Sequence, residues 1–311
     1  MLDVLVQTLP FFVVIGLGYG AARRGMFGPE ATAALTRFVF YFALSAMLLR
    51  FSARLDLAEV FDARFVAAYL LGTMAVYLVG LGTALWRTRN LEEAAVEGQC
   101  AAIGNTGFLG VPMLTMIFGE AAIGPVMLVL AVDLIVFSSL IVILITATRD
   151  GRLRPAVLWS VAKGLVANPM IVSIALGLGW AATGIALPGP VDATLALLGA
   201  AATPGALFAI GASLATKSAE RVEVAGWLSL LKLIAHPGAV ALAALVLFRV
   251  EPFAAGVMIA AAALPVAGNV YILAQHYGVA PQRVSSSILI STAAAVVTLP
   301  VVIARVLGLT G

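Results

Sequence analysis

The stretch GNTGFLGVPM at residues 104–113 lies inside a run from Ala94 to Phe118 that is otherwise apolar enough to form a membrane helix. Three glycines, an asparagine, a threonine and a proline within ten residues make a poor helix interior. A second stretch, ALPVAGNVYI at residues 263–272, interrupts another apolar run. The two stretches predict a pair of membrane helices that are broken partway across the bilayer.

The composition indicates a protein that lies in a lipid bilayer. Of the 311 residues, 62% are hydrophobic and 11% are charged, and the mean hydropathy is +1.10. A soluble domain carries roughly 25% charged residues. The formal net charge is only +3 and the basic residues mostly flank apolar runs, so we expect no nucleic-acid partner. The one cysteine, Cys100, excludes an internal disulfide.

Ten apolar stretches have the length of a membrane helix, for which about 20 residues are needed. They cover residues 4–22, 31–49, 65–86, 94–118, 121–147, 156–182, 190–215, 224–248, 253–277 and 284–307. The first stretch does not read as a secretory signal, because Asp3 precedes it and the arginines follow it. The polar segments between the stretches are too short for a soluble domain. We therefore expect an all-α polytopic membrane protein with ten transmembrane helices.

The basic residues between the spans predict the orientation of the chain. Loops after the odd-numbered spans hold ten of them, which are Arg23, Arg24, Arg87, Arg89, Arg149, Arg152, Arg154, Lys217, Arg221 and Arg283. The even-numbered loops and the tails hold five, which are Arg50, Arg54, Arg64, Arg249 and Arg305. Because basic loops stay in the cytoplasm, both termini should lie outside it. We expect a multi-pass protein of the plasma membrane, which would be the inner membrane of a bacterium.

The two broken spans occupy matching positions in two halves of the chain. Gly104-Asn105 and Gly268-Asn269 are 164 residues apart, and each pair lies in the fourth span of a half with five spans. An odd number of spans inverts the second half, so we expect two inverted five-helix repeats at 1–148 and 156–311, joined by a cytoplasmic linker at 149–155. Paired broken helices in inverted repeats indicate the binding site of a transporter. The alternative is that Gly and Pro serve close helix packing.

Three motifs together resemble the auxin efflux carrier family of secondary transporters, whose bacterial members include malonate and malate carriers. They are GNTGFLGVPM in span 4, KLIAHP at 232–237 in span 8 and ALPVAGNVYI in span 9. The resemblance implies a scaffold of spans 1, 2, 6 and 7, through which a homodimer would form. Spans 3–5 and 8–10 would form a transport domain that moves as an elevator, with spans 4 and 9 crossing at the midplane. The sodium–bile acid symporters look like more distant relatives with the same layout.

Backbone N–H groups at the start of each half-helix carry partial positive charge and suit a carboxylate. Asn105 and Asn269 add amide donors, although either could instead cap its half-helix. Strict symmetry is not expected, because Pro112 follows its asparagine by seven residues whereas Pro265 precedes its own by four. The predicted substrate-binding residues are Gly104, Asn105, Thr106, Pro112, Pro265, Gly268, Asn269 and Tyr271.

Four ionisable residues inside spans are candidates for proton or ion coupling, since each costs about 2.5–3.5 kcal/mol at the bilayer centre. They are Asp133, Lys232, His236 and Glu97. The structural alternatives are a buried hydrogen bond for Asp133, snorkelling for Lys232 and capping of a kink before Pro237 for His236. A sodium site of the bile-acid-symporter kind looks to need a carboxylate, and no acid lies within 100–116 or 260–275. We therefore expect coupling to protons or to the membrane potential rather than to sodium.

Other functional classes find little support in the sequence. There is no His-Glu-x-x-His motif, no pair of membrane aspartates and no spaced Cys/His set, so we expect neither an enzyme nor a metal site, and no cofactor. A channel could also use broken helices. The interpretation that fits the pattern best is a secondary transporter of a small organic anion, with a sodium-coupled symporter as the alternative.

Overall fold

A computed structural model describes residues 2–55, 62–150, 155–215 and 221–310, and these residues form helices without a β-strand. The helices of the first half are α1 (Leu2–Arg23), α2 (Pro29–Phe38), α3 (Leu44–Ser52), α5 (Ala63–Thr88), α6 (Leu91–Ala102), α7 (Val111–Phe118), α8 (Ile123–Val132) and α9 (Ser138–Asp150). Those of the second half are α10 (Pro155–Ala167), α11 (Pro169–Ala181), α12 (Gly189–Ala200), α13 (Ala202–Ala215), α14 (Val222–Leu230), α15 (His236–Ala241), α16 (Pro252–Ala262), α17 (Gly268–Tyr277) and α18 (Pro281–Thr310). The expected all-α class is confirmed.

Within the described residues, six helical segments are long and apolar enough to cross a membrane. They are Pro29–Ser52, Ala63–Thr88, Glu120–Arg149, Gly189–Ala215, Val222–Leu247 and Pro281–Gly308. A seventh span results if α10 and α11, which meet at an angle of 71°, are counted together. Of the other predicted spans, the first coincides with α1 and the two broken ones each consist of two short helices. The count of ten spans in inverted repeats stays a prediction, and residues 151–154 of the proposed linker lie outside the described residues.

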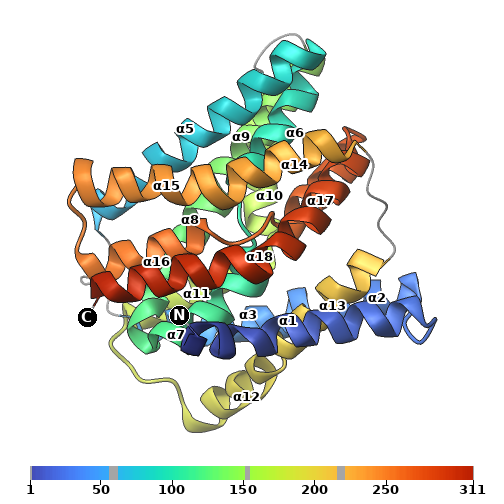
Figure 1. The fold of residues 1–311 in the computed structure, drawn as a ribbon. Helices are drawn as coiled ribbons and strands as arrows, with labels where there is room; N and C mark the ends of the chain where they lie inside the picture. Colours follow the sequence, from blue (N-terminus) through green and yellow to red (C-terminus); the bar gives the residue numbers. More distant parts are fainter. Residues whose placement is uncertain (1, 56–61, 151–154, 216–220, 311) are drawn as a thin grey trace.

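One group of helices comprises α1, α2, α3, α11, α12 and α13 (Figure 1). α1 lies along α13, and α3 packs against both α11 and α12. Glycine makes the first contact possible, because a Cβ at Gly18 would lie 2.1 Å from the carbonyl oxygen of Phe208, and one at Gly211 would lie 1.9 Å from that of Ile15. Small residues let membrane helices approach this closely.

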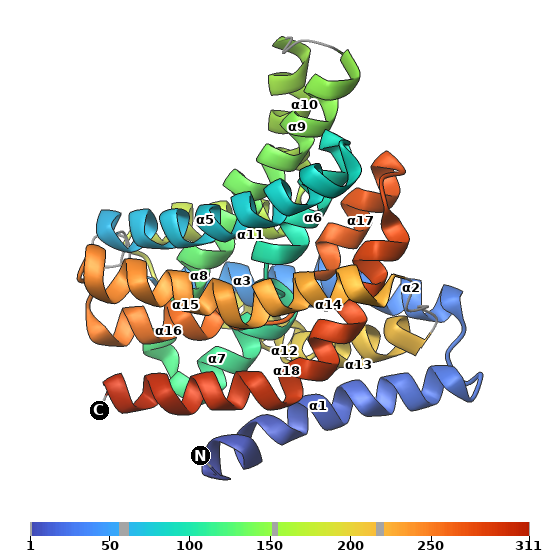
Figure 2. The same cartoon turned by 45° about the horizontal axis from the view of Figure 1, so that its top comes forward.

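A second group comprises α5, α6, α9 and α14 to α18, and Figure 2 shows α14 and α15 running between α5 and α18. Its closest contacts also use glycine, since a Cβ at Gly72 would lie 2.8 Å from the Cα of Val240. The two groups meet where α1 contacts α18 and where the segment after Asn105 contacts α13. Assigning the groups to a scaffold and a transport domain remains a prediction.

Several long helices contain π-helical turns, in which each N–H bonds five residues back and one extra residue is accommodated. Such turns occur at Val39–Ala43, Thr106–Gly110, Asp133–Phe137, Leu231–Ala235 and Leu242–Leu247. Three of them contain Thr106, Asp133 or Lys232, which are predicted site residues. The extra residue rotates these side chains relative to a regular α-helix.

Candidate transport site

The two broken spans cross each other through their non-helical backbone. α6 ends at Ala102 and α16 ends at Ala262, and beyond these ends Gly104 pairs with Val266 in an antiparallel bridge. The N–H of Asn105 donates to the carbonyl of Pro265 at 2.8 Å, and the N–H of Ala267 donates to the carbonyl of Ile103 at 3.1 Å. Each break thus satisfies backbone groups of the other, which is the condition for unwound backbone at membrane depth.

The asparagines at the crossing do not cap the half-helices. Asn105 precedes the π turn that leads into α7, and its side chain makes no capping hydrogen bond. Asn269 lies in the first turn of α17, whose cap is Ala267 without a side-chain bond. The Oδ1 atom of Asn269 is buried and has no hydrogen-bond partner in the described residues. The capping alternative is therefore not what the structure shows.

Asp133 connects the crossing to α5. Its carboxylate is buried, with 2% exposure, and accepts a hydrogen bond of 2.8 Å from the Tyr69 hydroxyl. The other carboxylate oxygen accepts one of 3.1 Å from the hydroxyl of Thr106, the residue that follows Asn105. The buried hydrogen bond to a neighbouring helix, expected as the structural role of Asp133, is present.

Lys232 and His236 lie together at the carboxyl end of α16. The Lys232 ammonium is fully buried, donates to the carbonyl of Ala262 at 2.5 Å and lies 2.9 Å from Nδ1 of His236. Nε2 of His236 lies 3.0 Å from the Thr73 hydroxyl. Full burial excludes snorkelling of Lys232 in this structure, and His236 does more than cap a kink because it bridges Lys232 to α5.

A chain of polar groups joins the two buried charges. It runs from Lys232 through His236 to Thr73, which also interacts with the Tyr69 hydroxyl, and from Tyr69 to Asp133. Asp133 and Lys232 also interact electrostatically. Tyr69 and Thr73 escaped sequence reasoning, although their spacing of four residues places them on one face of an apolar span.

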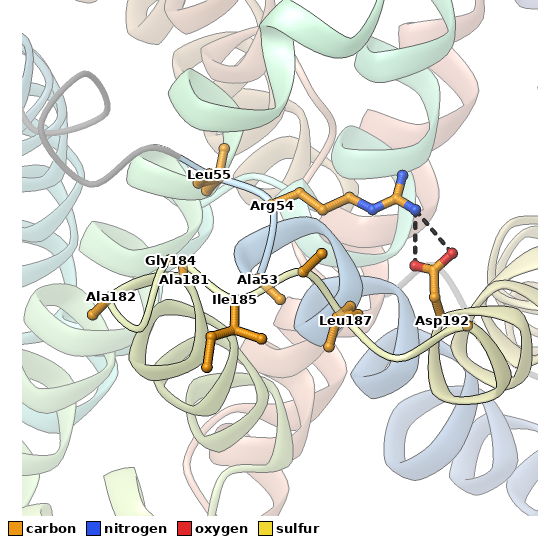
Figure 3. A pocket seen from close by; sticks show the side chains of 11 residues that line it. Ala53, Arg54, Leu55, Ala181, Ala182, Gly184, Ile185, Leu187 and Asp192 are labelled. Atoms are coloured by element: carbon orange, nitrogen blue, oxygen red, sulfur yellow. Dashed lines mark hydrogen bonds and ion pairs between the residues drawn. The ribbon is translucent and has the colours of Figure 1, made fainter.

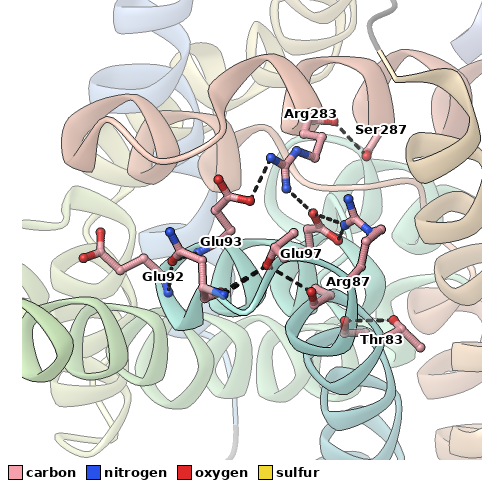
Figure 4. Close-up of polar contacts among 11 residues, drawn as sticks. Thr83, Arg87, Glu92, Glu93, Glu97, Arg283 and Ser287 are labelled. Atoms are coloured by element: carbon pink, nitrogen blue, oxygen red, sulfur yellow. Dashed lines mark hydrogen bonds and ion pairs between the residues drawn. The ribbon is translucent and has the colours of Figure 1, made fainter.

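Glu97 belongs to a separate cluster of charges, shown in Figure 4. Its carboxylate accepts from Arg87 at 2.5 Å and also pairs with Arg283. Arg283 pairs in turn with Glu93 at 2.9 Å. These ion pairs join α5, α6 and α18, so Glu97 has a partner on each side and its coupling role stays a prediction.

The remaining predicted residues lie on the half-helices that follow the breaks. Pro112 is buried in the first turn of α7, past the crossing, whereas Pro265 is part of the crossing itself. Gly268 begins α17, where a Cβ would meet open space. Tyr271 lies one turn further along α17 and is partly buried. The structure therefore brings most, but not all, of the predicted substrate residues together.

An open pocket of about 890 Å³ lies elsewhere, between the end of α3 and the connection from α11 to α12 (Figure 3). Arg54 and Asp192 line it and form an ion pair at 2.8 Å, and Arg50 pairs with the same carboxylate at 2.9 Å. None of the predicted site residues lines this pocket. Among the described residues, no group of three His, Cys, Asp or Glu side chains could hold a metal ion.

Comparison with known proteins places this site in context. The family described as "Membrane transport protein" matches residues 3–303. A protein named "Putative malonate transporter" from Rhizobium meliloti is 31% identical over 301 residues, covering 96% of this chain and 94% of its own. "Auxin efflux carrier component 5" from Arabidopsis thaliana is 24% identical, covering 97% and 95%. "Uncharacterized transporter YfdV" from Escherichia coli is 27% identical, covering 94% and 95%.

Proposed function

The chain belongs to the membrane transport protein family, and on this premise we propose that it is a secondary active transporter of a small organic anion. The anion would be a carboxylate or dicarboxylate such as malonate or malate, or an auxin-like acid, since relatives carry names of malonate and auxin carriers. The observation that supports this most is the crossing of two broken helices at Gly104 and Val266. Half-helix ends at such a crossing supply partial charges for an anion.

The anion would bind between Asn105 and Asn269, at the start of α17. The first turn of α17 contains no acidic residue, so its backbone N–H groups and partial positive charge are not neutralised within the helix. The carboxamide oxygen of Asn269 has no partner among the described residues, and a rotation of this group would present its NH₂ to a carboxylate. An anion held by dipoles rather than by an arginine can also be released.

Transport would follow alternating access of the elevator type, with the helix group around α5 and α18 moving against the group around α1 and α13. Contacts near the crossing support this, because they are apolar. The rings of Phe40 and Phe108 stack with their centroids 6.1 Å apart. The methyl group of Met170 packs closely on Gly107, because a Cβ added at Gly107 would lie only 2.4 Å from it. Apolar contacts can slide without leaving polar groups unpaired.

Transport would be driven by protons or by the membrane potential. Asp133 and Lys232, joined through Tyr69, Thr73 and His236, could take up and release a proton as the site changes its exposure to water. The alternative is a sodium-coupled symporter of the bile acid type, and a channel is less well supported. We further propose location in the plasma membrane with both termini outside the cytoplasm, and a homodimer formed through the helices around α1 and α13.

Uptake by purified protein in liposomes tests this proposal. Labelled malonate, malate and an auxin-like acid are offered with an imposed pH gradient, membrane potential or sodium gradient. We expect saturable uptake of at least one acid without a need for sodium, and a flatter pH dependence for Asp133→Asn if protons are coupled. Uptake that requires a sodium gradient at fixed pH would overturn the coupling, non-saturating flux would indicate a channel, and no uptake of any acid would overturn the substrate class.

A further inference from the structure

α16 ends inside the protein rather than at its surface, and this end requires a positive partner. The last carbonyl groups of a helix lack helical hydrogen-bond partners and carry partial negative charge. The carbonyl of Ala262 is one of these groups, and the chain turns away after it toward the crossing. In transporters with broken helices, such carboxyl ends coordinate the coupling cation.

The side chain of Lys232 occupies this position. Its Nζ atom lies 2.5 Å from the Ala262 oxygen and 2.9 Å from Nδ1 of His236. Nζ also lies next to the crossing, because a Cβ added at Gly104 would be only 3.2 Å from it. The same Cβ would be 3.3 Å from the Ala261 oxygen. A carbonyl oxygen and an imidazole nitrogen therefore contact a buried cationic atom, which also interacts electrostatically with the Asp133 carboxylate.

We infer that Lys232 is a covalently attached substitute for a free coupling cation, held at the carboxyl end of α16 and balanced by Asp133. This inference rests on the proposed function for its meaning in transport, but its geometry does not depend on the substrate. Nδ1 of His236 also lies 3.1 Å from the Ala262 oxygen, so the imidazole bridges the helix end to Thr73 in either tautomer. The charged lysine thus compensates both the negative helix end and the carboxylate in this structure.

Truncation of the side chain should create a site for a free cation. Lys232→Ala leaves a cavity beside the Ala262 carbonyl and His236, and the Asp133 carboxylate loses the buried positive charge with which it interacts. Removing one partner of a buried charge pair is strongly destabilising, and we expect Tm to fall by about 10 °C. A small cation that enters the cavity should restore stability in a saturable way.

The experiment measures Tm of the purified full chain in ammonium, methylammonium, sodium or choline chloride at constant ionic strength. We expect Lys232→Ala to regain most of its lost Tm in at least one of the three small cations and not in choline, which is too large. The wild type should melt at one temperature in all four salts. Lys163→Ala, at an exposed lysine of α10, and Lys232→Met, which fills the cavity without a charge, should not respond to the small cations.

Asp133→Asn combined with Lys232→Ala keeps the test decisive where the single variant fails to fold. The double variant lacks both charges of this pair, so it should fold, exceed the single variant in stability and show the same Tm in all four salts. A Lys232→Ala protein that melts like the wild type in choline, that responds equally to choline and to small cations, or that fails to fold together with the double variant would overturn the inference. Because Tm needs no substrate, a failure of anion uptake would affect the proposed function alone.

Discussion

The two broken spans are built differently at the ends of their half-helices. In the first, the segment that leads into α7 begins beside an acid, since Thr106 donates to Asp133. In the second, α16 ends on a base, since Lys232 donates to Ala262. The start of α17 and the segment into α7 both lack an acid in the first turn and a side-chain cap, but the segment into α7 has the Asp133 carboxylate beside it. Two similar breaks therefore need not make a symmetric site, and the uncompensated end is where we expect the anion.

The largest expected effect on the difference between the two breaks comes from replacing Asp133. Asp133→Ala leaves the Lys232 charge without its partner and the hydroxyls of Tyr69 and Thr106 without their acceptor. We expect the free energy of unfolding to fall by about 3–5 kcal/mol. Thermal unfolding measures this, with Asp192→Ala as the matched control, because its ion pairs with Arg50 and Arg54 are partly exposed. Equal effects of the two variants would contradict the difference between them.

Replacing the two asparagines tests whether both breaks contribute to substrate binding. Asn105→Ala and Asn269→Ala each remove amide donors from the crossing, and we expect substrate affinity to fall by about 1–3 kcal/mol, or roughly 5–150-fold. Tm should change little, because neither side chain caps a helix. Equilibrium binding of the transported acid is the measurement, with Gln275→Ala on the exposed side of α17 as the control. Unchanged affinity in both variants would place the anion elsewhere.

The two glycines test the difference in packing. A methyl group at Gly104 would lie 3.2 Å from Nζ of Lys232 and 3.3 Å from Cβ of Leu264, whereas one at Gly268 would meet open space. Gly104→Ala should therefore lower the free energy of unfolding by about 1–3 kcal/mol. Gly268→Ala should leave it unchanged or raise it by up to about 1 kcal/mol. Thermal unfolding of both variants decides, and the opposite order would refute the packing difference.

The smallest expected effect concerns the prolines. Pro265 belongs to the crossing and holds its backbone conformation, so Pro265→Ala should weaken substrate binding by about 0.4–1 kcal/mol through lost preorganisation. Pro112 lies in the first turn of α7, where a proline only helps the helix to begin. Pro112→Ala should therefore change substrate affinity by no more than about twofold. The same binding measurement covers both variants. A larger loss of substrate affinity in Pro112→Ala than in Pro265→Ala would contradict the expected difference between the two breaks.

Local composition allowed the breaks to be predicted from sequence. Glycine, proline and asparagine inside apolar runs locate both breaks to within a few residues, because their effect on helix formation is local. Their matching positions in the halves predicted a pair of broken spans, and the resemblance to the auxin efflux carrier family implied that the two spans cross. Asp133, Lys232 and His236 were also identifiable, since ionisable residues are rare in apolar spans.

Contacts between distant segments could not be predicted in this way. Tyr69 and Thr73 are ordinary residues of an apolar span, and only the fold shows that they link His236 to Asp133. The partners of Glu97 include Arg283, which is 186 residues away. The π turns were equally hidden, because an additional residue in a helical turn leaves no mark in the composition.

The π turns make the length of the spans as important as their composition. Residues in an α-helix are about 100° apart around its axis, so loss of the one extra residue in Asp133–Phe137 or Leu231–Ala235 would turn one half of the helix by roughly that angle against the other. Asp133 or Lys232 would then be turned away from the partners that it contacts in this structure. Related sequences should consequently conserve the number of residues between a span's polar group and its ends, and single-residue gaps at these turns should mark relatives with a rearranged site.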